Sequence, residues 1–257
     1  MKIWIIMAQE NPSKPRPNKD GRKWRSNTLA ETLSDRGHEV IRWRSSFSHQ
    51  KKIQLSKKST KERHDNYYQQ YIKARSYQNH ISIARFLSHY DLGSNFYKIA
   101  KNEDKPDLVH VANVPIELAY SVAKFCHLNK IPYIIDIRDL WPDIYVDLLP
   151  IKLSFLKKSL LNFLNLIYKQ QLKFIFSNAI GITALTKSFL NWSLNKVKRE
   201  KIKRDYILPM SFKNTFDKEK LLSKVDLYEK YKIKKGMTII SYVGNIGFQS
   251  NFNTILD

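Results

Sequence analysis

The chain has 257 residues, 42% hydrophobic and 26% charged, a composition that is typical of globular proteins and excludes an intrinsically disordered chain. Its 45 lysines and arginines exceed its 23 aspartates and glutamates, which gives a net charge of +22. Such a surplus indicates a polyanionic partner, and composition leaves open whether this is nucleic acid, an anionic membrane or a phosphate-bearing substrate. A genome-wide bias toward lysine, isoleucine and asparagine would also supply part of it.

The single cysteine, Cys126, excludes an internal disulfide and a cysteine-cluster metal site. It lies in a predicted helix beside Phe125 and Leu128, which favours a buried, inert thiol. The apolar opening of the chain, residues 1–7, stops before Gln9 and is too short for a secretory signal or a membrane span. We therefore expect a cytoplasmic protein.

The first predicted unit consists of a buried strand over residues 3–7, a loop over 8–23, a helix from Ser26 to Gly37 and a second strand over 38–43. The loop is rich in proline, asparagine and lysine, and the glycine ends the helix. This order is half of a mononucleotide-binding unit. The glycine fingerprint G-x-G-x-x-G is absent, which argues against an NAD enzyme.

The next stretch, residues 45–66, is basic and lacks periodicity, which predicts a mobile loop that is either simply solvated or attracted to anionic lipid. Residues 71–75 predict a third strand. Apolar residues at helical spacing predict a helix over residues 83–100, in which Gly93 is a weak point.

Residues 107–112 predict a fourth strand, which is followed by a helix from Pro115 to Leu128 and by a central strand that begins at Pro132. Strands and helices thus alternate from the start of the chain. This alternation predicts an α/β fold, a Rossmann-like doubly wound parallel sheet.

The central strand ends in the most polar stretch of its kind in the chain, which contains Asp136, Arg138, Asp139, Trp141 and Asp143. An apolar strand with a charged C-terminal end is typical of a buried parallel strand that delivers polar groups to a cleft, where ligands of open α/β sheets bind. This stretch is therefore the best candidate for a site. The alternative is a structural loop, in which the arginine pairs with one of its neighbouring aspartates and the tryptophan is an apolar plug.

Residues 151–176 predict a long helix with one apolar face, made by Leu153, Leu156, Leu160, Leu164 and Ile167. The opposite face carries lysines and asparagines, interrupted by two apolar residues, Phe155 and Leu166. These lysines are too frequent for a spanning helix. The helix either lies against a membrane or packs on the sheet.

The remaining chain predicts further alternation, with a strand over 179–183, a helix over 187–196, a basic cluster over 196–204, a short strand over 206–208 and a helix over 217–231. A linker is expected near Gly236, and residues 237–243 predict a new strand that ends in Gly-Asn-Ile-Gly. We therefore expect a first domain over residues 1–235 and the beginning of a second over 236–257.

Four stretches, in their order and spacing, resemble the family 4 glycosyltransferases of GT-B architecture, particularly those of bacterial surface-polysaccharide synthesis (O-antigen or capsule). They are KIWIIM…GRKWRSNTLAETLSDRGHEV, PDLVHVANVPIELA, IPYIIDIRDLWPD and SYVGNIG. The resemblance covers nearly the whole chain and implies two facing Rossmann-like domains, the first binding the acceptor and the second a nucleotide-sugar. It implies no metal and no cofactor beyond the nucleotide-sugar.

The resemblance also implies roles for individual residues. Catalytic residues would be Asp136, Arg138 and Asp139; acceptor-binding residues would be Arg16, Arg22, Arg25 and His110; and the donor diphosphate would meet Gly244, Asn245 and Gly247. The usual acceptor of this branch is a polyprenyl-diphosphate-linked sugar, whose phosphates suit forked guanidinium groups. The alternatives are a solvated loop for the arginines, a structural role for the histidine and a plain turn for the glycines.

The family's glutamate pair, which holds the donor ribose and sugar, would lie beyond Asp257. We therefore expect a fragment of a longer enzyme, a frameshifted remnant or one subunit of a split enzyme, inactive by itself and peripheral on the inner face of the membrane. The competing class is a basic, non-enzymatic protein that binds nucleic acid or a membrane, although the sequence holds no nucleic-acid-binding motif.

Overall fold

The computed structural model describes residues 1–10, 24–64, 66–79, 82–143, 154–210, 229, 231–234 and 236–242. The chain divides into two units, Met1–Lys213 and Asn214–Asp257, and every element below belongs to the first unit. The predicted domain boundary after residue 235 stays a prediction, because the preceding helix lies almost entirely outside the described residues.

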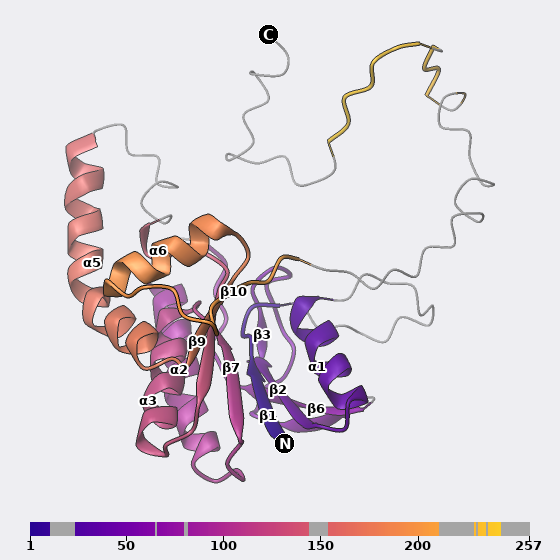
Figure 1. Cartoon of the computed structure of the whole chain (residues 1–257). Coiled ribbons are helices and arrows are strands. Elements are labelled where there is room, and N and C mark those ends of the chain that lie inside the picture. The colour runs from indigo at the N-terminus through magenta and orange to yellow at the C-terminus, as the bar shows by residue number, and fades with distance from the viewer. Residues whose placement is uncertain are drawn as a thin grey trace. The chain divides into compact units, whose positions relative to one another are not determined.

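Within the described residues, eight strands form one sheet in the order β10-β9-β8-β7-β1-β2-β6-β5 (Figure 1). Their bounds are β1 (Lys2–Ile6), β2 (Glu39–Ser45), β5 (Lys61–His64), β6 (Tyr67–Ile72), β7 (Leu108–Ala112), β8 (Tyr133–Ile137), β9 (Gly181–Ala184) and β10 (Tyr206–Ile207). Every pair is parallel except β5 with β6. From β1 the chain builds the sheet outward first through β2 and β6, then on the other side through β7 to β10. This order is that of a Rossmann-like doubly wound sheet, so the predicted fold class is confirmed.

Helices cover both faces of the sheet, namely α1 (Arg25–Asp35), α2 (Ile83–Ala100), α3 (Ile116–Leu128), α5 (Ser154–Ser177) and α6 (Lys187–Val197). On one face, Ala30 of α1 packs with Ile5 and Val40 in a small apolar cluster. The larger core lies on the opposite face, under α2, α3, α5 and α6. Both faces of the central strands are therefore buried, as parallel sheets require.

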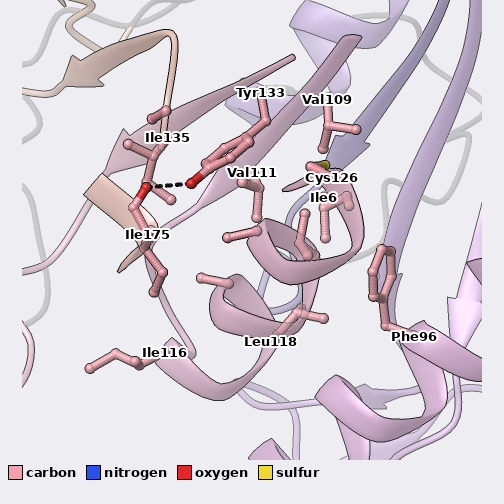
Figure 2. Close-up of a cluster of buried hydrophobic side chains, with 14 of the residues drawn as sticks. Ile6, Phe96, Val109, Val111, Ile116, Leu118, Cys126, Tyr133, Ile135 and Ile175 are labelled. Atoms are coloured by element: carbon pink, nitrogen blue, oxygen red, sulfur yellow. Dashed lines mark hydrogen bonds between the residues drawn. The ribbon is translucent and has the colours of Figure 1, made fainter. Parts of the chain in front are cut away.

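The larger core is built on aromatic rings and on α3 (Figure 2). Trp4 stacks on Phe125 at 5.8 Å between ring centroids and lies 4.6 Å from Trp43. Tyr133 donates its hydroxyl proton to the backbone carbonyl of Ile175 at 2.6 Å, which satisfies a polar atom inside this apolar layer.

The loop predicted over residues 45–66 is wrong in part, because three short strands interrupt it. Strands β3 (Phe47–Ser48) and β4 (Ile53–Gln54) form a hairpin, and β5 forms the antiparallel edge of the main sheet. The hairpin is held through Ser46, whose hydroxyl accepts from the Gln54 side chain at 2.8 Å. Charged residues suit an edge strand, since they discourage pairing with another chain. The paired residues lie at most nine positions apart, but the strands are short and polar, so the hydrophobic periodicity of the sequence does not reveal them.

Two further predicted strands differ from the structure. The third strand of the parallel sheet, β6, spans Tyr67–Ile72 rather than residues 71–75. Its body contains Gln69 and Gln70, which pair with both neighbouring strands. These polar residues hid the start of the strand from a prediction based on apolar runs. The strand predicted over residues 237–243 is absent from its described part, residues 237–242. Ile239 and Ile240 are exposed there, and a strand needs a ladder partner that this segment does not have among the described residues.

Candidate functional site

The candidate site lies at the C-terminal edge of the sheet, beside the point where the strand order reverses. Strands β1 and β7 are neighbours in the sheet, yet the chain leaves them toward opposite sides. Such a reversal opens a crevice outside the carboxyl ends of the strands in doubly wound folds. Glu10 follows β1, Asn113 follows β7 and Arg138 follows β8, so parallel pairing brings three segments together at this edge.

Asn113 joins the loops that follow β7 and β8. Its side-chain oxygen accepts from the backbone N–H of Arg138 at 3.0 Å, and its side-chain nitrogen donates to the carbonyl oxygen of Asp139 at 2.7 Å. Its own backbone N–H donates to the carbonyl oxygen of Asp136 at 2.9 Å. Because Asn113 is fully buried, these bonds fix the start of the polar stretch in one conformation.

Arg138 pairs with Glu10, not with either of its neighbouring aspartates. Its Nη1 donates to Glu10 Oε1 and lies 2.9 Å from the sulfur of Met7. The Glu10 carboxylate also accepts from the backbone N–H of Ser26 at 3.1 Å and from Arg42 at 3.4 Å. Burial by itself would raise the pKa of Glu10, but the adjacent Arg138 and Arg42 outweigh it and lower that pKa. Glu10 is therefore held as a buried carboxylate.

Asp136 is fully buried beneath this edge of the sheet. Its Oδ1 accepts from Arg25 Nη2 at 2.7 Å and from the Thr183 hydroxyl at 2.6 Å. Arg25 also donates to the backbone carbonyl of Leu208. One ion pair thus connects α1, β8, β9 and the end of β10.

Two more buried arginines lie at the end of β2. Arg42 donates to the hydroxyl of Ser26 at 2.7 Å and to the side-chain oxygen of Gln69 at 2.8 Å. Arg44 donates to the backbone carbonyl of Glu10 at 2.9 Å and lies over the ring of Tyr71. Together with the two arginines above, the described part of the edge holds four guanidinium groups and three carboxylates, those of Glu10, Asp136 and Asp139. Its surplus of positive charge favours an anionic ligand.

His110 lies on β7 and is buried on the same face of the sheet as Asp136. Neither of its ring nitrogens has a hydrogen-bond partner within the described residues. Burial lowers the pKa of His110, and the nearby Arg25 and Arg138 lower it further, against the opposing effect of Asp136 and Glu10. His110 is therefore a neutral imidazole under the site.

The structure thus brings together five of the predicted site residues, Arg25, His110, Asp136, Arg138 and Asp139. Asp139 is exposed and Arg138 is partly exposed, with 14% of its side chain accessible, whereas the other three are buried. Arg16, Arg22, Gly244, Asn245 and Gly247 lie outside the described residues, so their roles stay predictions. The roles predicted for the five described residues are likewise untested by this geometry.

Sequence reasoning missed Glu10, Asn113 and the arginines of β2. A signal was present for the first two, because Asn113 directly follows a predicted strand and Glu10 lies three residues beyond the end of another. Arg42 and Arg44 gave a weaker signal, since alternating arginines also suit a half-exposed strand. Trp141, by contrast, is a partial plug as the structural alternative proposed: it contacts the ring of His89 edge to face and lies beneath the guanidinium of Arg85.

The described residues contain neither a cluster of metal-binding side chains nor a membrane-spanning helix. No group of three or more histidine, cysteine, aspartate or glutamate side chains lies close enough together there to hold a metal ion. In the same part of the chain, no helix combines the length and the apolar character that crossing a bilayer requires.

Comparison with known proteins gives a likeness of fold. No protein-family model matches the sequence, and no curated protein matches it. Among solved structures, the chain is similar to Arabidopsis thaliana UGT89C1 in complex with quercetin, at 11% identity and a TM-score of 0.46 over 86% of this chain and 53% of that one. The complex with UDP gives 10% identity and a TM-score of 0.43 over 82% and 54%. The complex with UDP-L-rhamnose gives 10% and 0.44 over 86% and 53%. The chain thus spans about half the length of these structures, and at this similarity they carry no argument about its activity.

Proposed function

We propose that this chain is the acceptor-binding lobe of a family 4 glycosyltransferase, which moves a sugar from a nucleotide-sugar to a lipid-linked or saccharide acceptor in the synthesis of a cell-surface polysaccharide. The observation that carries the proposal is the convergence of Arg138, Asn113 and Glu10 at the reversal point of the sheet, where folds of this class bind their ligands. The order of the sequence motifs supports it independently.

In this proposal Arg138 and Asp139, the two accessible residues of the site, contact the acceptor. Arg138 offers forked donors to an acceptor phosphate while Glu10 and Asn113 hold it in place. The acceptor hydroxyl attacks the sugar carbon, its proton passes to the exposed carboxylate of Asp139, and the nucleoside diphosphate leaves with the bonding electrons. Asp136 is too deeply buried to touch a ligand, so it acts as a positioning residue through Arg25.

The proposal extends to partners and place. Arg16 and Arg22 would add further contacts to the acceptor, and the turn with Gly244, Asn245 and Gly247 would meet the donor diphosphate. No metal is assigned a role. We further propose that the protein works at the inner face of the membrane, where a lipid-linked acceptor is available, and that residues 1–257 by themselves bind acceptor but transfer little sugar.

The test measures, by titration calorimetry, how tightly the 257-residue chain binds a water-soluble, short-chain polyprenyl-diphosphate-linked monosaccharide. We expect saturable binding that Arg138→Gln weakens at least about tenfold, equivalent to about 1.4 kcal/mol, and that Asp139→Asn leaves largely intact. The matched control is Glu103→Gln, since Glu103 lies after α2 at the opposite edge of the sheet and pairs there with Lys61. Absence of saturable binding, or equal weakening by the control, would refute the proposal, and full sugar transfer by this chain alone would refute its inactivity.

A second candidate function rests on the net charge of +22, which also favours a non-enzymatic nucleic-acid binder. Filter binding to duplex DNA at several salt concentrations separates the two. A nucleic-acid binder retains specific affinity for DNA at physiological salt and ignores the acceptor analogue. A glycosyltransferase lobe binds the acceptor analogue and loses its affinity for DNA at physiological salt.

A further inference from the structure

Helix α5 carries an apolar stripe of four exposed side chains, which no other described residue covers. Phe155, Phe163, Leu166 and Ile167 are 65%, 58%, 74% and 46% exposed, respectively. At about 100° of rotation per residue, these four side chains fall within an arc of about 120°. The helix turns a different arc toward the core, where Leu164, Tyr168 and Leu172 are buried. Sequence analysis placed Ile167 on the core-facing side, and the structure corrects this.

The charged residues of α5 all have one sign. Lys158, Lys169 and Lys173 are exposed and fall within an arc of about 60° that adjoins the apolar stripe. The helix, Ser154–Ser177, contains no aspartate or glutamate. A helix with an exposed apolar stripe beside a row of lysines has the pattern of one that lies in the plane of a membrane interface.

The stripe runs from the first turn of α5, at Phe155, to just past its midpoint, at Ile167, and its position follows from the topology. Because α5 leads into β9, it runs antiparallel to the strands, and its first half lies toward the edge of the sheet that holds the candidate site (Figure 1). Tyr168 confirms this placement, since its hydroxyl donates at 2.7 Å to Glu117 in the first turn of α3, just after β7. A surface that rests on the stripe is therefore at the same end of the sheet as Arg138.

A shallow groove on the helical layer beside α5 has a similar character. It has a volume of about 540 Å³ and lies between α2, α3 and α5. Its lining includes Tyr90, Tyr120, Lys98 and Lys124. Tyrosines and lysines are the residues that populate the boundary between lipid and water.

We propose that the exposed stripe and lysine row of α5 form a docking surface for an anionic lipid bilayer, with the apolar side chains inserted among the acyl chains and the lysines against the headgroups. Charge complementarity selects this occupant over a second copy of the chain, because two such lysine rows would repel each other. The inference deepens the proposed function, since it names the surface that would bring a lipid-linked acceptor to the site.

The first test is flotation of the 257-residue chain with vesicles of phosphatidylcholine alone or with phosphatidylglycerol added. We expect binding only to the anionic vesicles, and a loss of at least about tenfold in partitioning for Phe163→Ser/Leu166→Ser and for Lys158→Gln/Lys169→Gln/Lys173→Gln. The matched control, Ile53→Ser/Ile202→Ser, likewise replaces two exposed apolar side chains with serine, but both lie outside α5. Circular dichroism and thermal melting establish that all variants fold.

The second test locates the lipid contact on the helix. Since the native thiol of Cys126 is buried, a Leu166→Cys variant is labelled selectively with a polarity-sensitive fluorophore, and Ile202→Cys serves as its control. Anionic vesicles should shift the emission of the α5 label to the blue and leave the control unchanged. Failure of wild-type chain to float, equal loss in the Ile53/Ile202 control, or no shift at position 166 would overturn the proposal. Binding of the water-soluble acceptor analogue is measured without vesicles. Failure of the membrane proposal is therefore distinguishable from failure of the proposed acceptor binding.

Discussion

Arg25 and Asp136, 111 positions apart in the chain, form a buried ion pair with 2.7 Å between Nη2 and Oδ1. The arginine opens α1 and the aspartate lies near the end of β8. The pair therefore fixes the N-terminus of the helix that covers one sheet face against the strand that leads into the candidate site. Both residues are buried in this contact, and the binding and catalytic roles predicted for them stay predictions.

The first prediction concerns the free energy of unfolding contributed by this pair. Asp136→Ala leaves a buried guanidinium without its carboxylate, so we expect a loss of about 3–5 kcal/mol, with a similar loss for Arg25→Met. The double variant Arg25→Met/Asp136→Leu should recover most of the loss, because neither charge is then stranded. Urea denaturation measures all three. Glu103→Gln, at a partly exposed pair, should cost at most about 1 kcal/mol; single-variant losses no larger than this would contradict the prediction.

The second prediction concerns acid. The pKa of Glu10 in the folded chain lies below its ordinary value of 4.5, so near and below that value the unfolded chain binds more protons than the folded one. The stabilisation is therefore complete above about pH 5 and is lost as the pH falls through the folded-state pKa. The unfolding free energies of wild-type protein and Glu10→Gln should differ most at neutral pH and converge as the pH falls through the folded-state pKa of Glu10. A difference that is constant or grows in acid would exclude the ionised pair with Arg138.

The third prediction concerns the reactivity of Cys126. Burial raises the pKa of its thiol to about 12, and only the thiolate reacts readily. The native chain at about pH 8 should therefore react with a disulfide reagent far more slowly than the chain unfolded in guanidinium, where the thiol returns to about 8.5. A colorimetric thiol assay measures both rates. Comparable rates would show that the helix carrying Cys126 opens freely.

The fourth prediction concerns the contact between α2 and α3. A Cβ atom at Gly93 would lie 2.7 Å from the hydroxyl oxygen of Ser121 and 2.8 Å from the backbone oxygen of Glu117. Helix propensity alone would make Gly93→Ala stabilising by about 1 kcal/mol. We expect destabilisation by about 1–3 kcal/mol instead, because the second helix must move away.

The neighbouring position provides the control for that substitution. Ser94→Ala changes the same turn of α2 without adding an atom toward α3, so its effect on thermal stability should be small and set by propensity. Should Gly93→Ala raise the melting temperature as much as propensity predicts, the close packing of the two helices would be excluded.

Much of the fold was predictable because the spacing of apolar residues along the sequence indicates the strands and helices. The alternation of short apolar runs with helical spacing identified the parallel strands on both sides of β1 and the helices between them, including the unbroken α2. The polar end of β8 indicated the correct edge of the sheet. Local sequence reports these features because a strand buried on both faces must be apolar along its length.

The sequence by itself determined the alternation of elements, the fold class and the edge of the sheet at which polar groups collect. Only the tertiary structure decided that Arg138 pairs with Glu10 and that Asp136 lies beneath the site. It also decided that Ile167 faces outward. The physical reason is that each of these outcomes depends on a partner remote in sequence, whose distance and burial are set by how the strands and helices pack rather than by the residues adjacent in the chain.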